Sequence, residues 1–225
     1  MSGPPGAGKT TALLALSRAH PHIARFGVRD YAYRLACAGL PLGLQLKTAI
    51  AGNQVPIDLV VAEFAHFLDH LPLGCTSVIT DGYPRIGAEC SNWHDVVRRR
   101  HLRIRAVTLL SVSSTTALLR AQRRRICTAC GLPTPGSPER CGRCGHPTSV
   151  RQDDTLEQLE ARIGHYQSGR RGLIRYFQNI CPIKEIDADA SASVVHARLR
   201  AALFPDKHPR DLATAETRSA SCTDG

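Results

Sequence analysis

GPPGAGKT, from Gly3 to Thr10, fits the phosphate-loop pattern G-x-x-x-x-G-K-[ST] at every position. In such a loop the glycines let successive backbone N–H groups point into one concavity, and the following helix adds the positive end of its dipole. The run TALLALSRA after the loop is typical of a helix, whereas a flexible tail rich in glycine and proline does not predict one. We therefore expect phosphates to bind a set of loop residues: Gly3, Gly6, Ala7, Gly8, Lys9, Thr10 and Thr11.

Two residues of this loop carry specific chemistry. Lys9 is expected to reach the β- and γ-phosphates of a nucleotide, and the hydroxyl of Thr10 to hold Mg²⁺. Only Met1 and Ser2 precede the loop, although such a loop normally follows a buried strand. Either that strand lies upstream of Met1, or the chain is a degenerate relative without it. We favour the first explanation, because the charged residues that phosphate chemistry needs are present downstream.

The length and the cysteine content bound the class of protein. At 225 residues the chain is long enough for one sizeable core, or for a core and a small inserted module. No apolar run approaches the ~18–20 residues of a membrane span, and no charged leader precedes an apolar stretch. Nine cysteines without such a leader favour metal binding or free thiols in a reducing compartment. We expect a cytoplasmic protein with no membrane partner.

The chain is basic, with 29 Lys and Arg against 19 Asp and Glu and a net charge of +10. Most of the cations are arginines. Because arginine binds phosphate bidentately, one interpretation is an arginine-rich phosphate site; the other is a general preference for arginine on solvated faces. The run RRRHLRIR, residues 98–105, favours the second, as the exposed end of a helix that leads into a strand. Nucleic acid is therefore not an expected partner.

Helical and extended patterns alternate along the chain. Apolar stretches predict strands at 22–28, 76–80, 105–112 and 183–187. Helical patterns cover 10–19, most of 29–71 with breaks at 39–41 and 52–56, 115–125, 155–177 with a break near 169–172, and 190–203. The polar stretch 205–225 predicts a disordered tail. This alternation indicates an α/β protein with a parallel sheet.

A second motif, ITDGYPR, follows the predicted strand at 76–80. Asp81 comes at the carboxyl end of that strand, where ligands bind in open α/β sheets, and a carboxylate there can order Mg²⁺ through water. Gly82 permits a sharp turn, after which Arg85 projects over the site. On its own the stretch also fits an ordinary strand-to-turn junction. Together with the phosphate loop it indicates a phosphate site.

Four cysteines form two C-x-x-C pairs, each followed by glycine: Cys127 with Cys130, and Cys141 with Cys144. Four thiolates suit tetrahedral Zn²⁺ with no open position, so we predict a structural zinc site instead of coincidental cysteines. The ten residues between the pairs are fewer than the usual ~15–20, so the loop must be tight. A zinc ribbon alone suggests nucleic-acid binding. The flanking Arg124 and Arg151 indicate instead a flap that carries charge onto a phosphate.

These motifs resemble those of adenylate kinases and related nucleoside monophosphate kinases, in the form whose LID domain carries a zinc knuckle. The resemblance covers residues 2 to 204 and rests on GPPGAGKTT, DGYPR, RAQRRRICTACG, RQDD and LEARIGHY. It implies a P-loop NTPase-type parallel sheet with flanking helices and two mobile inserts. The core domain would then comprise residues 1–126 and 151–204, with a helical acceptor-binding insert at 29–60 and the LID at 127–150.

The resemblance also implies a role for individual residues. Arg120 would cover the adenine of ATP, while Asp81 helps to place Mg²⁺ and Asp153 and Asp154 belong to the LID hinge. Phosphoryl transfer would be assisted by Lys9, Arg85, Arg124, Arg151 and Arg162. The acceptor would be bound by Arg29, Asp30, Arg34, Val55, Gly82, Arg85 and Glu89, with Arg85 on its α-phosphate.

The predicted acceptor site departs from the family's pattern T-G-D-x-L-R. The stretch VRDYAYR keeps Asp30 but has Tyr33 at the arginine position, with Arg34 one residue later. The glutamine that reads adenine in the family falls on Glu89. An ionised carboxylate only accepts hydrogen bonds and favours a base edge with two donors, such as that of guanine. Alternatively, Glu89 is a surface residue and the base is read elsewhere. The identity of the acceptor base stays open.

We therefore expect a monomeric kinase that binds ATP and a nucleoside monophosphate, uses Mg²⁺, and holds a structural Zn²⁺. In-line phosphoryl transfer needs two aligned substrates and concentrated positive charge in a site closed to water. Two alternatives remain. One is a phosphate-loop kinase of another small acceptor, and the other is a non-catalytic nucleotide- or RNA-binding module with a zinc ribbon.

Overall fold

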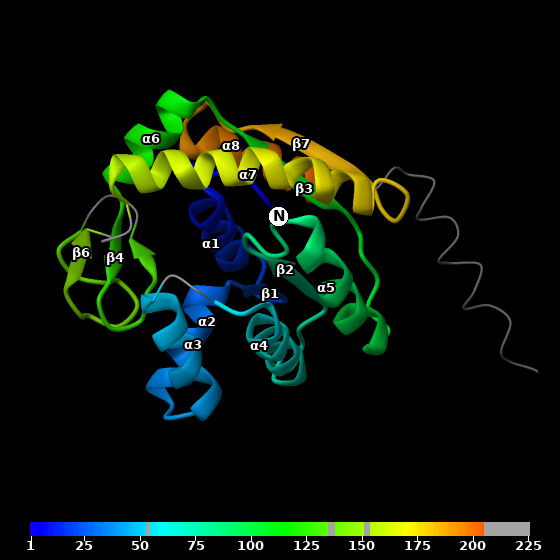
Figure 1. Cartoon of the computed structure of the whole chain (residues 1–225), viewed down its shortest axis with the longest axis horizontal. Helices are drawn as coiled ribbons and strands as arrows, with labels where there is room; N and C mark the ends of the chain where they lie inside the picture. The colour runs from blue at the N-terminus through cyan, green and yellow to red at the C-terminus, as the bar shows by residue number, and fades with distance from the viewer. Residues whose placement is uncertain (53–54, 135–137, 151–153, 205–225) are drawn as a thin grey trace, which may run out of the picture.

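Two pairs of parallel strands lie at the centre of the molecule, with helices around them (Figure 1). The computed structural model describes residues 1–52, 55–134, 138–150 and 154–204. β1 (Ile23–Phe26) pairs with β2 (Ser77–Thr80), and β3 (Val107–Ser111) pairs with β7 (Ile183–Asp187). These strands lie within the stretches that the sequence predicted, and the α/β class with parallel strands is confirmed.

The first two residues of the chain lie between the two strand pairs. Ser2 forms an isolated parallel bridge with Leu109 of β3. On the other side, the amino nitrogen of Met1 donates a hydrogen bond to the carbonyl of Thr80 at the end of β2, at 2.8 Å. The carbonyl of Met1 accepts from the amide of Gly82 at 2.9 Å. The phosphate loop therefore starts at the carboxyl ends of β2 and β3.

Helices pack on the strands through separate apolar layers. α1 (Lys9–Ala19) and α8 (Ala192–Leu203) share a layer with β7. α5 (Gly87–Arg99) packs in a larger layer that includes residues of β1 and β3. Because successive side chains of a strand point to opposite faces, β3 contributes Leu109 to the larger layer and Leu110 to the side of α8. β3 is thus buried on both faces, as its apolar sequence indicated.

Three helices form the segment in which the sequence predicted the acceptor insert. They are α2 (Val28–Cys37), α3 (Pro41–Ala51) and α4 (Ile57–Asp69). The first break falls at Gly39, whose φ of 74° suits glycine, and Pro41 then occupies the first turn of α3, where a missing N–H costs nothing. The first predicted break is therefore confirmed. Of the second, at 52–56, residues 53 and 54 lie outside the described residues; α3 ends at Ala51 and α4 begins at Ile57.

The cysteine-rich segment forms a small antiparallel sheet of its own. β4 (Arg125–Cys127) is central, between β5 (Pro133–Thr134) and β6 (Thr148–Val150). It follows α6 (Ser114–Gln122), and in Figure 1 it lies at one end of the molecule, beside α2. Residues 127–150 are called the four-cysteine loop below.

α7 (Leu156–Phe177) is a single continuous helix, so the predicted break near residues 169–172 is wrong. A Cβ on Gly169 would lie 2.5 Å from the side chain of Ile86, and one on Gly172 would lie 3.4 Å from the backbone of Gly87. These glycines let α7 and the start of α5 approach closely; they do not interrupt the helix. None of the described helices, α7 included, is long and apolar enough to cross a membrane.

Candidate active site

The phosphate loop has the backbone conformation that its glycines allow. Gly6 and Gly8 have φ values of 77° and 80°, in the left-handed region that favours glycine. A Cβ on Gly6 would lie 2.0 Å from the carbonyl oxygen of Ala117, so no other residue fits there. The Nζ of Lys9 donates to the carbonyl oxygens of Gly3 (2.6 Å) and Pro4 (2.8 Å). The ammonium group is thus held against the loop that the sequence assigned to phosphates.

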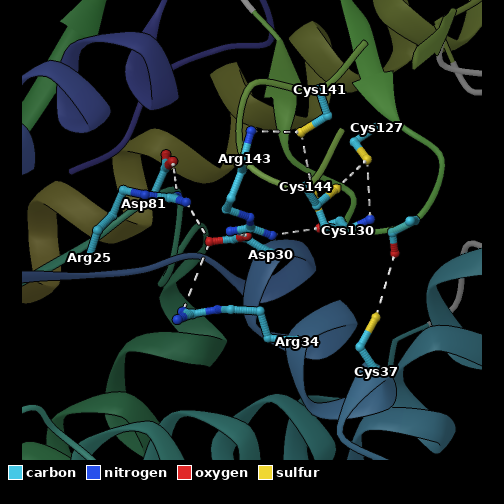
Figure 2. A network of polar contacts seen from close by, with 11 residues as sticks. Arg25, Asp30, Arg34, Cys37, Asp81, Cys127, Cys130, Cys141, Arg143 and Cys144 are labelled. Atoms are coloured by element: carbon cyan, nitrogen blue, oxygen red, sulfur yellow. Dashed lines mark hydrogen bonds and ion pairs between the residues drawn. The ribbon is translucent and has the colours of Figure 1, made fainter. Parts of the chain in front are cut away.

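A row of buried charges extends from the phosphate loop. The hydroxyl of Thr10 donates to Oδ2 of Asp81 at 2.7 Å, and Nη1 of Arg25 donates to the same oxygen at 3.0 Å. Nη2 of Arg25 donates to Oδ2 of Asp30 at 2.6 Å. Figure 2 shows Arg25 lying between the two carboxylates. The structure therefore brings together Thr10 and Asp81, the two residues predicted for Mg²⁺. Their hydroxyl and carboxylate oxygens are the donor type that this ion prefers.

Sequence reasoning missed Arg25. A signal existed, since Arg25 is the one charged residue of the otherwise apolar strand β1. The structure shows that its side chain is indeed buried. A buried guanidinium needs carboxylate partners, and the nearest acidic residue in the sequence is Asp30. The pattern therefore indicated a pair between these two residues.

Asp30 is the point at which several cations meet. Besides Arg25, Nη1 of Arg143 donates to its Oδ1 at 2.6 Å, and Nη2 of Arg34 lies 4.0 Å from its Oδ2. Arg143 comes from the four-cysteine loop, far away in sequence, and was not predicted. The guanidinium of Arg34 also lies over the ring of Tyr31, 4.9 Å from its centroid.

The DGYPR turn is held by Glu89. One oxygen of this carboxylate accepts from the backbone N–H of Arg85 at 2.6 Å, and the other from its Nη2 at 2.8 Å. Glu89 is 4 % exposed, so it is not a surface residue, whereas more than half of the Arg85 side chain is exposed. The φ of Gly82 is 70°, which makes the sharp turn before Arg85 possible.

Asp154 gathers two of the arginines predicted for transfer. Its carboxylate, which is fully buried, accepts from Nε and Nη2 of Arg124 at 2.6–3.0 Å and from Nη1 of Arg162 at 3.0 Å. The predicted residues Arg151 and Asp153 lie outside the described residues, as does the tail 205–225. Two partly buried positive charges therefore converge on a single acidic residue beside α7.

The remaining predicted residues lie around this centre. Arg120 of α6, which was predicted to cover the adenine, donates to the carbonyls of Ala188 (2.8 Å) and Ala190 (2.7 Å), just after β7. Val55 packs against the apolar cluster between α2 and α3. Arg29 lies in the first turn of α2, and Thr11 in the first turn of α1.

The four predicted cysteines come together. The sulfur atoms of Cys127, Cys130, Cys141 and Cys144 all lie within 4.8 Å of one another. Backbone amides of Cys130 and Arg143 each donate to a cluster sulfur at 3.4 Å. Although burial opposes it, hydrogen bonds from the backbone amides of Arg143 and Cys144 lower the pKa of the Cys141 thiol to about 7. Four thiols in reach of one ion, with amides that stabilise thiolates, fit a tetrahedral zinc site.

Comparison with known proteins places the chain in a family. It is 31 % identical over 216 residues to the adenylate kinase of Symbiobacterium thermophilum, covering 88 % of this chain and 98 % of that protein. The chain belongs to the adenylate kinase family. The adenylate kinases of Desulfitobacterium hafniense and Moorella thermoacetica are each 29 % identical, over 87 % and 91 % of this chain and 92 % and 96 % of their own lengths. No family model matches the chain.

Tyr33, which occupies the arginine position of the adenylate kinase pattern, contacts the four-cysteine loop. A Cβ on Gly131 would lie 3.1 Å from the Tyr33 ring, so the backbone of Gly131 packs directly on that ring. Gly131 has a φ of 65°, which also favours glycine. The aromatic residue at this position therefore serves contact between α2 and the four-cysteine loop.

Proposed function

We propose that the protein is a nucleoside monophosphate kinase, which transfers the γ-phosphoryl group of ATP to a nucleoside monophosphate and yields ADP and a nucleoside diphosphate. One observation carries the proposal. The Thr10 hydroxyl lies 2.7 Å from the Asp81 carboxylate, directly beside a phosphate loop with its lysine in place. Membership of the adenylate kinase family supports the same reaction.

Thr10 and Asp81 are the residues that would hold Mg²⁺. When bound, the ion would neutralise charge on the phosphates of ATP. Asp81 also accepts from Arg25, so its carboxylate keeps one orientation through two hydrogen bonds. A carboxylate fixed in this way needs little reorganisation when the nucleotide binds.

The cations of the site would exchange partners on binding. Lys9 now donates to two backbone carbonyls, and a phosphate is a stronger acceptor for an ammonium group than a neutral carbonyl. Arg124 and Arg162 share Asp154, and the migrating phosphoryl group offers both of them an alternative anion. Positive charge would then concentrate on the group that moves, which is the main contribution a protein makes to phosphoryl transfer.

On the acceptor side, Arg85 would bind the monophosphate, and Glu89 would hold the Arg85 side chain in position. Both oxygens of Glu89 are engaged with Arg85, through its backbone and its side chain. We therefore assign Glu89 to orienting the guanidinium, in place of reading the base. Asp30, Arg34 and Val55 would line the rest of this side of the site.

The four-cysteine loop would bind Zn²⁺ as a structural ion. Its three short strands have few apolar residues of their own, so four metal–sulfur bonds would supply the stability that a small core lacks. The metal would take no part in the chemistry. It would stiffen the segment from which charge is presented to the phosphates.

The test is formation of ADP from ATP with AMP, GMP, CMP, UMP and dAMP offered separately, in the presence of Mg²⁺. Turnover with one of these acceptors is the expected result, and Asp81→Asn should lower kcat by at least a hundredfold. Asp58→Asn, on an exposed position of α4, is the matched control. Absence of turnover with all five acceptors would refute the proposal. It would point to another small acceptor, or, if the protein bound RNA tightly, to a zinc-ribbon module.

A further inference from the structure

One face of α2 packs against the four-cysteine loop at three places. Asp30, Tyr33 and Cys37 are spaced three and four residues apart, so they lie on one side of the helix. Asp30 accepts from Arg143, and the ring of Tyr33 contacts Gly131. The Cys37 sulfur lies 3.9 Å from the carbonyl oxygen of Ala129. Figure 2 shows Cys37 pointing toward the side of the four cysteines. Three successive contacts along one helix face form a continuous interface.

Arg143 is the charged residue of this interface, and the cysteines fix its position. It lies between Cys141 and Cys144 in the sequence. Its backbone N–H donates to the sulfur of Cys141 at 3.4 Å, and its Nη2 donates to the carbonyl of Cys130 at 3.2 Å. Both C-x-x-C pairs therefore hold the residue, and its second guanidinium nitrogen reaches Asp30 at 2.6 Å.

Asp30 shares its buried partner with another carboxylate. The side chains of Asp30 and Asp81 are both buried, and both accept hydrogen bonds from the guanidinium of Arg25. Because burying a carboxylate is costly unless it is well paired, a further cation at Asp30 lowers that cost. Arg34 is 46 % exposed and 4.0 Å away, so its contribution is screened. Arg143 is 33 % exposed and forms a short, charge-assisted hydrogen bond.

We infer that Arg143 is a positioning residue: by pairing with Asp30 it holds the four-cysteine loop closed against α2 and keeps Arg25 aligned between Asp30 and Asp81. The row of contacts then runs without interruption from the cysteines to the Thr10 hydroxyl. The effect of Arg143 on catalysis rests on the proposed function, because Asp81 and Thr10 act on a nucleotide only if the protein is a kinase. The contact between Arg143 and Asp30 can be tested without substrates.

The first measurement is closure in the absence of substrates. Fluorescent dyes are attached through non-natural amino acids at the exposed positions 44 and 139, on α3 and on the four-cysteine loop. Arg143→Gln should raise the open-to-closed ratio about tenfold, the size of effect typical of one charge-assisted hydrogen bond. Arg143→Lys should restore part of the closed state. Arg140→Gln is the matched control, because Arg140 is exposed and bonds to Gly145 within its own loop.

The second measurement asks whether Arg143 acts through Asp30. Asp30→Asn should open the loop as Arg143→Gln does, and the double variant should be no more open than either single one. Asp30 lies outside the cysteine loop, so this arm stays decisive even if Arg143→Gln binds zinc poorly. Zinc content is measured in every variant. If Asp30→Asn leaves the distance distribution unchanged, or if the two effects add, the inference is overturned.

The kinetic measurement separates this inference from the proposed function. Arg143→Gln should raise the KM for the acceptor about tenfold, with the KM for ATP within twofold of the parent. If the parent shows no turnover with any acceptor, the proposed function fails while the distance measurements still decide on closure. If turnover is normal but Arg143→Gln and Arg140→Gln have the same closed fraction, the proposed function stands and this inference fails.

Discussion

Glu63 is a buried carboxyl group whose replacement should stabilise the protein. It lies on α4 and is 0 % exposed, and neither carboxyl oxygen makes a hydrogen bond of good geometry with the described residues. Its neighbour Phe64 belongs to an aromatic cluster with Phe26 and Tyr83. Burial raises the pKa of Glu63 from 4.5 to about 9, and the nearby backbone N–H of Ala32 and the positive charge of Arg34 offset only part of that effect. At neutral pH the folded chain therefore keeps this proton.

The size of the effect follows from the two pKa values. Between pH 4.5 and about 9 the unfolded chain has lost the proton and the folded chain holds it. In that window the free energy of unfolding falls by ~1.4 kcal/mol per pH unit, because the folded state binds the additional proton. Stability from this group is complete below pH 4.5 and is lost as the pH rises. At pH 7 the loss is roughly 3 kcal/mol, a large part of the ~5–15 kcal/mol typical of a folded protein.

Glu63→Gln removes the titration while keeping nearly the same shape. Urea unfolding is followed at pH 5, 6, 7 and 8 through the fluorescence of Trp93, which stacks on Phe64 at 5.9 Å and so reports on the same cluster. The difference in unfolding free energy between variant and parent should grow by about 1.4 kcal/mol per pH unit, in favour of the variant at high pH. Glu63→Leu should show the same slope and a higher stability, since it also removes the unpaired polar atoms.

Zinc binding also depends on pH, so all samples contain zinc in excess and only differences from the parent are compared. Asp58→Asn, an exposed acidic residue of the same helix, is the control and should give a difference that does not change with pH. If the profile of Glu63→Gln is parallel to that of the parent from pH 5 to 8, Glu63 is ionised in the folded protein and the reasoning is refuted.

The other predictions concern the loop, the metal, the acceptor and the sheet. Lys9→Ala should lower kcat by ~10³-fold or more, and a value within threefold of the parent would remove phosphoryl transfer from consideration. Metal analysis of reduced protein should find about one zinc per chain, and chelation should lower the Tm; protein free of zinc would contradict the site. Glu89→Gln should raise the KM of all acceptors without changing their order, whereas a changed order would show that Glu89 reads the base. Burial lowers the pKa of the Met1 amino group to about 6, so folding at neutral pH forces this group to give up its proton. An N-terminal extension of ~5 β-branched residues, which replaces the amino group by a peptide N–H and can pair with β2 and β3, should raise the Tm by several degrees. An unchanged Tm would show that those strand edges need no partner.

The local motifs could be predicted because their chemistry depends on residues close in sequence. The phosphate loop needs glycines at fixed spacing, and the structure shows Gly6 and Gly8 in the left-handed conformation that favours glycine. The two C-x-x-C pairs likewise fix four sulfur atoms within 4.8 Å of one another. Asp81 could be assigned to the same Mg²⁺ site as Thr10 because it follows the carboxyl end of a parallel strand, where ligands bind in α/β proteins.

The contacts between distant segments could not be predicted in the same way. Arg143 and Asp30 are 113 residues apart, and nothing in the local pattern of either one identifies its partner. The role of Glu89 was hidden for a different reason. Carboxylates are mostly exposed in proteins, so a surface position was a reasonable expectation. Here the turn after Asp81 brings the backbone N–H of Arg85 to the Glu89 carboxylate, and this hydrogen bond offsets part of the cost of burying it.

The cations of the site are paired inside the protein, and this pairing bears on how it can open and close. Lys9 has two carbonyl oxygens, and Arg124 and Arg162 share Asp154. Leaving these partly buried charges without partners would be costly, which would disfavour a state without phosphate. With internal partners, the states with and without phosphate both have paired charges, so their free energies can lie close together. A ligand then shifts the equilibrium between these states only if it binds the cations more strongly than their partners inside the protein do. A polyphosphate can do so, whereas a neutral molecule cannot.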